Sequence, residues 1–159
     1  MNENMVSRKY LGALRVLLGI IFLVTWAENL RKGFYTPNGF RRFIELLADG
    51  HPLEFYRLFL LGVMAPGAGF VSFFQMIAEL GMGLALLTGT LTRLAGLGAT
   101  FFFLNLFLAY LNPNLGEWIW TYVMLLALAV VITLGSAGRA WGVDALLAKR
   151  NEHPRWPVY

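Results

Sequence analysis

Four long apolar runs divide this chain, at residues 10–28, 70–88, 93–111 and 118–135. Each approaches the ~20 mostly apolar residues that a helix needs to cross the hydrocarbon core of a bilayer. Short polar or glycine-containing hairpins join the second run to the third and the third to the fourth, so these runs are antiparallel neighbours. The pattern predicts an all-α integral membrane protein, a four-transmembrane-helix bundle built as a single domain over residues 1–159.

The long connection between the first two runs carries a helical pattern of its own. Thr36-Pro37 offers an N-cap followed by proline at the first helical position. Apolar residues then recur at i, i+3, i+4 and i+7 from Phe40, with charged residues on the opposite face. We expect an interfacial amphipathic helix over about 37–49, with a lid packed on the bundle as the alternative. A second interfacial helix is expected over about 52–64, since that run is too short to span a membrane; a re-entrant helix or one buried against other helices is the alternative.

Composition supports the membrane assignment and limits the cofactors that the chain could hold. The chain is 58% hydrophobic and only 14% charged, which no soluble domain of this size requires. It has no cysteine, which excludes disulfides, iron–sulfur clusters and thiol redox couples. Its two histidines lie outside the apolar runs, where they cannot ligate an intramembrane haem. We therefore expect no covalently bound or metal-ligated cofactor.

The basic residues indicate how the chain is oriented. The formal charge of +4 comes from Lys and Arg residues that flank apolar runs. Basic residues in such places set the orientation of a protein in the membrane, so we do not interpret them as a nucleic-acid-binding surface. The hairpin between the second and third runs contains Arg93, while the opposite hairpin has no Lys or Arg. We expect a multi-pass protein of the cell membrane with both termini cytoplasmic. The first run has no small-residue cleavage site after it, so we expect a retained helix and not a signal peptide.

Two ionisable residues lie inside apolar runs, Arg15 in the first and Glu79 in the second. A charge at membrane depth costs at least ~2.5–3.5 kcal/mol, so such residues usually face a bundle interior with a partner. From their depths, a polar cluster of Arg15, Glu79, Asn105 and Gln75 is geometrically possible. The cluster would be either a functional site or an ion pair that only holds the bundle together.

Two further groups of residues suggest chemistry near the ends of the runs. Glu28, Asn29 and Glu117 gather at the outer side, as a site or as ordinary interfacial carboxylates. Phe101-Phe102-Phe103 and Phe107 suit either a groove for a quinone or lipid tail, or a lipid-facing surface.

Four stretches of the sequence together resemble the DoxX superfamily, and most closely its DoxD-like branch, the small subunit of thiosulfate:quinone oxidoreductase. The most specific stretch is a glutamate–glycine helix that runs from Glu79 into a Gly-x-x-x-Arg hairpin ending at Arg93. The others are Leu14-Arg15 with Gly19, Trp26 through Tyr35, and Gly116-Glu117-Trp118-Ile119-Trp120. The resemblance implies a four-helix membrane bundle that works with a second subunit to pass electrons from thiosulfate to quinone.

These observations lead to two hypotheses of different classes. In the first, the chain is a membrane subunit of a quinone-linked oxidoreductase, and its partners are the bilayer, other membrane subunits, a quinone and a small anion such as thiosulfate. The catalytic candidates are then Glu79, Arg15 and Glu28, and the substrate-binding or quinone-binding candidates are Arg31, Lys32, Arg41, Arg42, Gln75 and Asn105. In the second, the chain is a non-catalytic accessory subunit of a larger respiratory or photosynthetic complex. A transporter is disfavoured because no internal repeat is visible.

Overall fold

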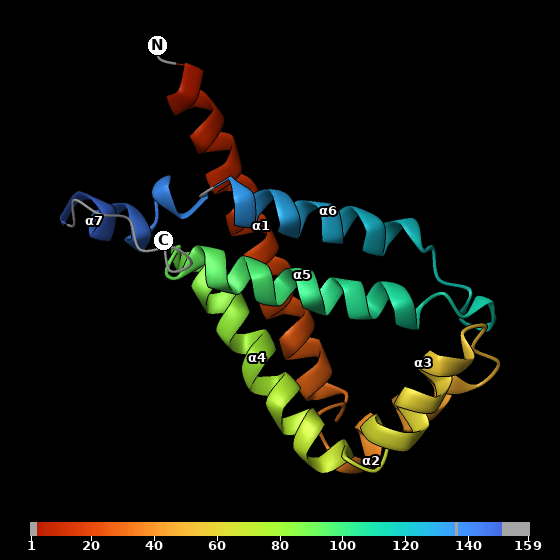
Figure 1. Ribbon diagram of the computed structural model, residues 1–159. Coiled ribbons are helices and arrows are strands. Elements are labelled where there is room, and N and C mark those ends of the chain that lie inside the picture. The colour runs from red at the N-terminus through yellow and green to blue at the C-terminus, as the bar shows by residue number, and fades with distance from the viewer. Residues whose placement is uncertain (1–2, 136, 151–159) are drawn as a thin grey trace.

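The computed structural model describes residues 3–135 and 137–150, and within these ranges the chain is helical, with no strand (Figure 1). Four helices are long: α1 (Glu3–Arg31), α4 (Ala68–Thr88), α5 (Thr92–Ala109) and α6 (Trp120–Leu134). The shorter elements are α2 (Pro37–Ala48), α3 (Glu54–Phe59), the π-helical turn η1 (Leu60–Met64), the 3₁₀ turns η2 (Pro113–Leu115) and η3 (Ala137–Arg139), and α7 (Val143–Arg150).

Three of the long helices are long and apolar enough to cross a membrane, within Lys9–Arg31, Ala68–Thr88 and Thr92–Ala109. They coincide with the first three predicted spans. The fourth predicted span lies on α6, which is apolar but has only 15 residues. At 1.5 Å per residue α6 is about 22 Å long, less than the ~30 Å hydrocarbon core.

The long helices form two closely packed pairs, α1 with α4 and α5 with α6. Glycine allows the first pair to approach: a Cβ on Gly19 would lie 2.7 Å from the backbone nitrogen of Leu87, and one on Gly83 would lie 2.7 Å from Leu23 Cδ2. In the second pair Gly96 lies directly against Thr133. Small residues at such contacts are typical of helices that associate in lipid, where backbones must come close to gain van der Waals contact.

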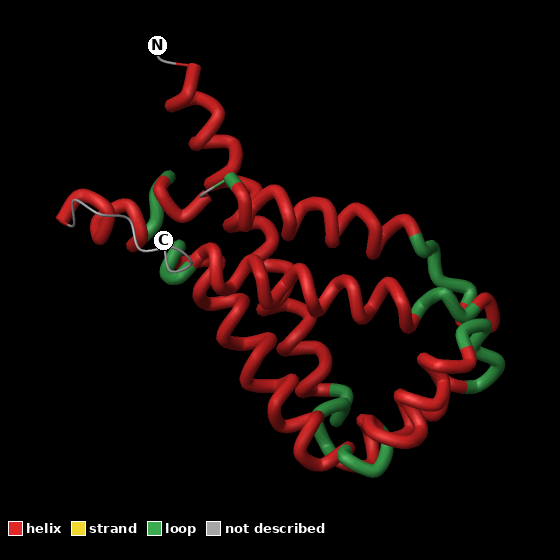
Figure 2. The backbone as a smooth tube through the Cα atoms, viewed as in Figure 1, coloured by secondary structure: helices red, strands yellow, loops and turns green. Residues whose placement is uncertain are grey.

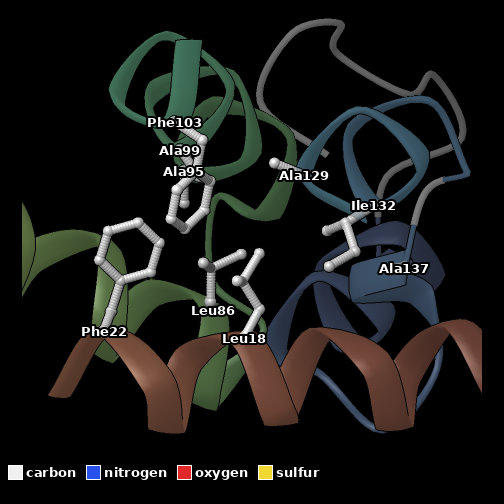
Figure 3. Packing of buried hydrophobic residues seen from close by; sticks show 9 residues of the cluster. All are labelled: Leu18, Phe22, Leu86, Ala95, Ala99, Phe103, Ala129, Ile132 and Ala137. Carbon is white, nitrogen blue, oxygen red and sulfur yellow. The ribbon is translucent and has the colours of Figure 1, made fainter. Parts of the chain in front are cut away.

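The two pairs meet in one apolar core, which Figure 3 shows from close by. Leu18 of α1, Leu86 of α4, Ala99 of α5 and Ile132 of α6 are all fully buried there. Away from this core the pairs diverge, and the α2–α3 segment lies across the wide end between them (Figures 1 and 2).

The α2–α3 segment joins the two pairs through a second apolar core and several polar contacts. The α2 face made of Phe40, Ile44 and Leu47 is buried and packs with residues of α3, η1, α4 and α5. Asn112, near the start of the α5–α6 connection, donates from Nδ2 to the carbonyl oxygens of Leu47 (3.1 Å) and Asp49 (2.7 Å).

The helix expected over 37–49 is present. Thr36 caps it as predicted, with its side chain accepting from the backbone N–H of Gly39 at 3.1 Å. Its apolar face is covered by protein, as it would be in a lid, and the interfacial placement of this helix stays a prediction.

The helix expected over 52–64 forms as α3 and η1, which together continue the same segment. His51 precedes it and links it to α5: its Nδ1 accepts from the backbone N–H of Leu53 (3.1 Å), and its Nε2 donates to the carbonyl oxygen of Leu108 (2.9 Å). Several apolar side chains of the segment point outward, including Phe55 and Val63. Such a surface suits lipid contact, and the interfacial placement of this segment stays a prediction.

Candidate functional site

A cavity of about 570 Å³ lies where the two helix pairs diverge, beneath α2. It is mostly apolar, and aromatic rings make up much of its wall. Its polar lining groups are few and come chiefly from α1 and α4. The lining residues are Ile21, Phe22, Thr25, Asn29, Lys32, Phe34, Gly39, Phe43, Gln75, Glu79, Phe102, Phe103, Leu106, Tyr110, Thr121, Tyr122 and Leu125.

Glu79 of α4 is the acidic residue in the wall of this cavity, and it is fully buried. Three side chains donate hydrogen bonds to its carboxylate. Tyr35 Oη lies 2.6 Å and Asn29 Nδ2 3.3 Å from Oε2, while Gln75 Nε2 lies 2.6 Å from Oε1. A buried carboxylate requires such partners, because an unpaired one would pay the full cost of desolvation. The arrangement therefore fixes the position of the carboxyl group at the cavity wall.

The chain reversal after α1 places Tyr35 beside Glu79. Gly33 ends the helix with φ +70°, a left-handed conformation that glycine adopts without steric cost. Phe34 then donates its backbone N–H to the carbonyl oxygen of Asn29 (2.9 Å), and its ring packs edge-on against Phe43 of α2 with centroids 5.1 Å apart. Burial, together with the Glu79 carboxylate, raises the pKa of Tyr35 above its ordinary value, so this phenol stays neutral at physiological pH.

Aromatic residues of α5 and α6 form the opposite wall. The rings of Tyr110 and Tyr122 stack with centroids 4.5 Å apart and planes 10° apart. Phe102 and Phe103 lie further along α5, each within 5.5 Å of the Phe22 ring, centroid to centroid. Flat rings on this side and a hydrogen-bonded carboxyl group on the other give the cavity the character of a site for a planar, weakly polar molecule.

Arg15 and Glu79 do not form the expected ion pair. Arg15 is buried near the middle of α1, where its guanidinium lies against the backbones of Gly89 and Gly142 and interacts electrostatically with Asp144 of α7. Asp144 in turn accepts from the backbone N–H groups of Leu91 (Oδ1, 2.9 Å) and Thr92 (Oδ2, 2.9 Å) at the start of α5. The carboxylate that accepts these two N–H groups at the start of α5 therefore offsets part of the cost of burying Arg15.

The register of α1 against α4 explains this correction. Gly19 lies against Leu87, and Leu23 lies against Gly83. Continuing this antiparallel register places Glu79 level with about residue 27, twelve residues from Arg15, or roughly 18 Å along the helix axis. The prediction from depth is wrong because α1 begins at Glu3 and projects past the end of α4 (Figure 1). Arg15 therefore lies level with the end of α4, and Glu79 lies further along the helix pair.

The remaining candidates are divided between the cavity and the surface. Gln75 and Lys32 line the cavity. Asn105 does not line this cavity, but it lines a smaller one of about 60 Å³ together with Gln75. Its side-chain and backbone oxygens accept from Tyr56 Oη at 2.9 and 3.1 Å. Glu28 lies on the surface, where its Oε2 pairs with Lys32 Nζ at 3.1 Å. The other surface candidates, all exposed, are Arg31, Arg41, Arg42 and Glu117.

Sequence reasoning missed Tyr35, Asp144 and the stacked pair Tyr110–Tyr122. Tyr35 stands in a loop, and no periodic pattern signals that it reaches a helix 44 positions away. Asp144 lies beyond the last apolar run, where no motif marks it. Within residues 3–135 and 137–150, no three His, Asp or Glu side chains gather in a way that could hold a metal ion.

Comparison with protein-family models places the chain among known sequences. A family model described as TQO small subunit DoxD matches residues 10–156, which is nearly the whole chain. No solved structure matches it.

Proposed function

The chain belongs to the DoxD family, and from that premise we propose that it is the membrane subunit of a thiosulfate:quinone oxidoreductase-type complex whose quinone binds in the cavity beside Glu79. A multi-pass membrane protein that works with other subunits agrees with the family description of a small subunit. The observation that carries the proposal is a fully buried, hydrogen-bonded carboxyl group on the wall of a largely aromatic cavity.

The size and lining of the cavity support a quinone ring as its occupant. Ligand cavities typically enclose about 300–1,000 Å³ and combine apolar walls with a few placed polar groups. Here the volume is about 570 Å³. A flat ring can lie against the phenylalanine and tyrosine rings of α5, while Gln75, Asn29 and Lys32 offer hydrogen bonds to its oxygens. These side chains would orient the quinone, and the apolar wall would keep water from it.

Glu79 would supply protons during the reaction. Reduction of a quinone to a quinol takes two electrons and two protons, one proton for each ring oxygen. The electrons come from thiosulfate, two of which join through a new sulfur–sulfur bond, and they reach the quinone with the help of the partner subunit. A protonated Glu79 would give its proton to a quinone oxygen, acting as a general acid.

The exposed basic residues beside the site suit an anionic substrate or an acidic partner surface. Arg31, Arg41 and Arg42 are all exposed near the α1–α2 connection. Clustered positive charge raises the local concentration of an anion, and salt screens this effect over about 8–10 Å. Reversing the charge of Arg41 and Arg42 should therefore raise the apparent KM for thiosulfate at low salt, with the increase fading at high salt. An increase that persists at high salt would argue against steering.

For topology, we propose that α6 is the fourth span and that both termini are cytoplasmic. Trp118 and Trp120 at the start of α6 are exposed, as residues of an interfacial aromatic belt would be. Because the chain has no cysteine, Asn38→Cys on α2 gives a single labelling site. An impermeant thiol reagent should label it in intact cells. Labelling only after lysis would place α2 in the cytoplasm and reverse this topology.

A cavity-filling substitution tests the quinone site. Leu125 lines the cavity from α6, and Leu125→Trp should reduce its volume enough to exclude a ring. We expect the complex with this variant to show a raised KM for a quinone analogue and unchanged assembly with its partner. Leu84→Trp, on the outward face of α4, is the matched control and should leave the KM unchanged. If both variants reduce quinone as the unmodified complex does, the cavity is not the quinone site, and a non-catalytic accessory role becomes the better account.

A further inference from the structure

Glu79 is hydrogen-bonded both to residues that line the cavity and to a residue of the α1–α2 connection. Two of its hydrogen-bond donors, Asn29 and Gln75, line the cavity with it. The third, Tyr35, does not line the cavity, and it lies in the partly exposed α1–α2 connection next to the exposed Thr36. Its hydroxyl makes a short 2.6 Å hydrogen bond to Glu79 Oε2. One fully buried carboxyl group in the cavity wall is therefore hydrogen-bonded to two lining side chains and, through one phenol, to the α1–α2 connection.

Among the described residues, nothing comparable connects Glu79 with the opposite face. The core between Glu79 and α7 includes Leu18, Leu86, Ala99 and Ile132, which are fully buried and carry no polar side-chain atom. The hydroxyls of Thr100 and Thr133 in this part of α5 and α6 donate to carbonyl oxygens of their own helices. Protons move along hydroxyl groups, carboxyl groups and water, and an apolar core of native density holds none of these. Arg15, the polar side chain at the far end of that core, is roughly 18 Å away along the helix axis.

We propose that the protons taken up on quinone reduction enter from the α2 face of the membrane, through Tyr35 to Glu79 and then to the quinone. This inference rests on the proposed function and adds the side and the route of proton uptake. Tyr35 is a positioning and relay residue in it, and Glu79 is the group that touches the quinone.

The proton and electron balance of the relay is simple. Two thiosulfate ions lose two electrons and form one tetrathionate, and the quinone gains two electrons and two protons. For each proton, the Glu79 O–H bond breaks as a quinone O–H bond forms. Tyr35 then gives its hydroxyl proton to the Glu79 carboxylate and takes one from water at the α2 face. The phenol ends each cycle neutral, which agrees with its raised pKa.

The other titratable groups that face the cavity do not hydrogen-bond the Glu79 carboxylate. Lys32 is held by Glu28 at 3.1 Å on the surface of α1. Tyr110 and Tyr122 stack on each other across the cavity from Glu79. Neither pair has a hydrogen bond to the Glu79 carboxylate, whose three donors come from other residues.

The side of proton uptake can be measured in vesicles. The complex of this chain, carrying Asn38→Cys, with its natural partner is reconstituted with a quinone in the bilayer and a pH dye in both the lumen and the bulk. Labelling of the introduced thiol by an impermeant reagent gives the fraction of α2 faces that point outward. With thiosulfate on both sides, the share of the alkalinisation that appears in the bulk should equal the fraction of α2 faces that point outward. A protonophore should abolish the pH difference between bulk and lumen.

Two outcomes are distinguishable from this one experiment. Quinone reduction with alkalinisation on the α7 side would overturn the proposed route and leave the proposed function standing. No thiosulfate-dependent quinone reduction at all would contradict the proposed function itself.

Removal of one oxygen tests Tyr35. Tyr35→Phe should keep the ring and quinone binding but lower kcat at least about tenfold, since a positioned proton-transfer group contributes about 10²–10⁴-fold. The loss should deepen as pH rises and should be partly reversed by high concentrations of a small weak acid. Tyr56→Phe is the matched control, since Tyr56 also buries a hydrogen-bonded hydroxyl, on Asn105. Equal kcat and pH profiles for the two variants would exclude the relay.

Discussion

Gly19→Ala is expected to weaken the contact between α1 and α4. A Cβ at this position would lie 2.7 Å from the backbone nitrogen of Leu87 and 3.1 Å from the carbonyl oxygen of Gly83. Both neighbours are backbone atoms, so the clash can be relieved only by moving the two helices apart. Overpacking of this kind typically costs about 1–3 kcal/mol. The alanine also favours helix formation by up to about 1 kcal/mol, which works in the opposite direction.

Gly81→Ala separates the two effects, because it lies on the outward face of α4 and its Cβ would meet nothing within 4 Å. It gains the helix propensity without the clash. The difference between the two variants therefore isolates the steric cost, about 1–3 kcal/mol. Reversible unfolding of the purified protein, followed by tryptophan fluorescence in mixed micelles, measures it. If the two variants are equally stable, the close approach of α1 and α4 at Gly19 is wrong.

Three further predictions concern buried polar groups. In a double-mutant cycle of unfolding free energies, Arg15→Gln and Asp144→Asn should show a coupling energy of about 0.5–3 kcal/mol. The effects of Arg15→Gln and Glu79→Gln on the unfolding free energy should be additive. Coupling in the second pair alone would mean that Arg15 pairs with Glu79, which contradicts the structure. Glu79→Gln should change stability by less than about 1 kcal/mol, because an amide of the same shape can still hydrogen-bond. It should also lower quinone turnover of the complex about 100-fold or more, and unchanged turnover would leave Glu79 only a structural role. Burial raises the pKa of Tyr56 to about 12, so the folded state holds this proton more tightly. The contribution of this raised pKa to the free energy of unfolding is complete below about pH 10 and is lost as the pH rises from about 10 to 12. Tyr56→Phe should therefore show a smaller fall in stability over that window. Parallel plots of stability against pH for the two proteins would contradict this.

The sequence predicts those features correctly that are decided by interactions within a few neighbouring residues. The apolar runs gave the long helices because only a helix satisfies its own backbone in lipid. Thr36-Pro37 gave the start of α2, since a cap and a proline act within a single turn. Gln75 was placed near Glu79 because the two lie one turn apart on the same helix.

The misplaced residues depend on contacts between distant segments. Arg15 was assigned to Glu79 because the register between α1 and α4 was unknown, and glycine contacts decide that register. Asn105 is bonded to Tyr56, from the segment that crosses the wide end of the bundle. The cavity exists because the two helix pairs diverge, and no periodicity along the chain encodes the angle between pairs. Its aromatic walls were visible in the sequence only as phenylalanines that lipid would explain equally well.

The most direct test of the central claim is to locate a bound quinone. A short-chain quinone carrying a photoreactive group is irradiated with the intact complex, and the labelled peptides of this chain are identified by mass spectrometry. The account predicts labels on cavity-lining segments of α1, α5 and α6, around Thr25, Leu106 and Leu125, which disappear when unlabelled quinone is added. Labels confined to the outward face of α4, around Phe70 and Phe74, and insensitive to competition would contradict it.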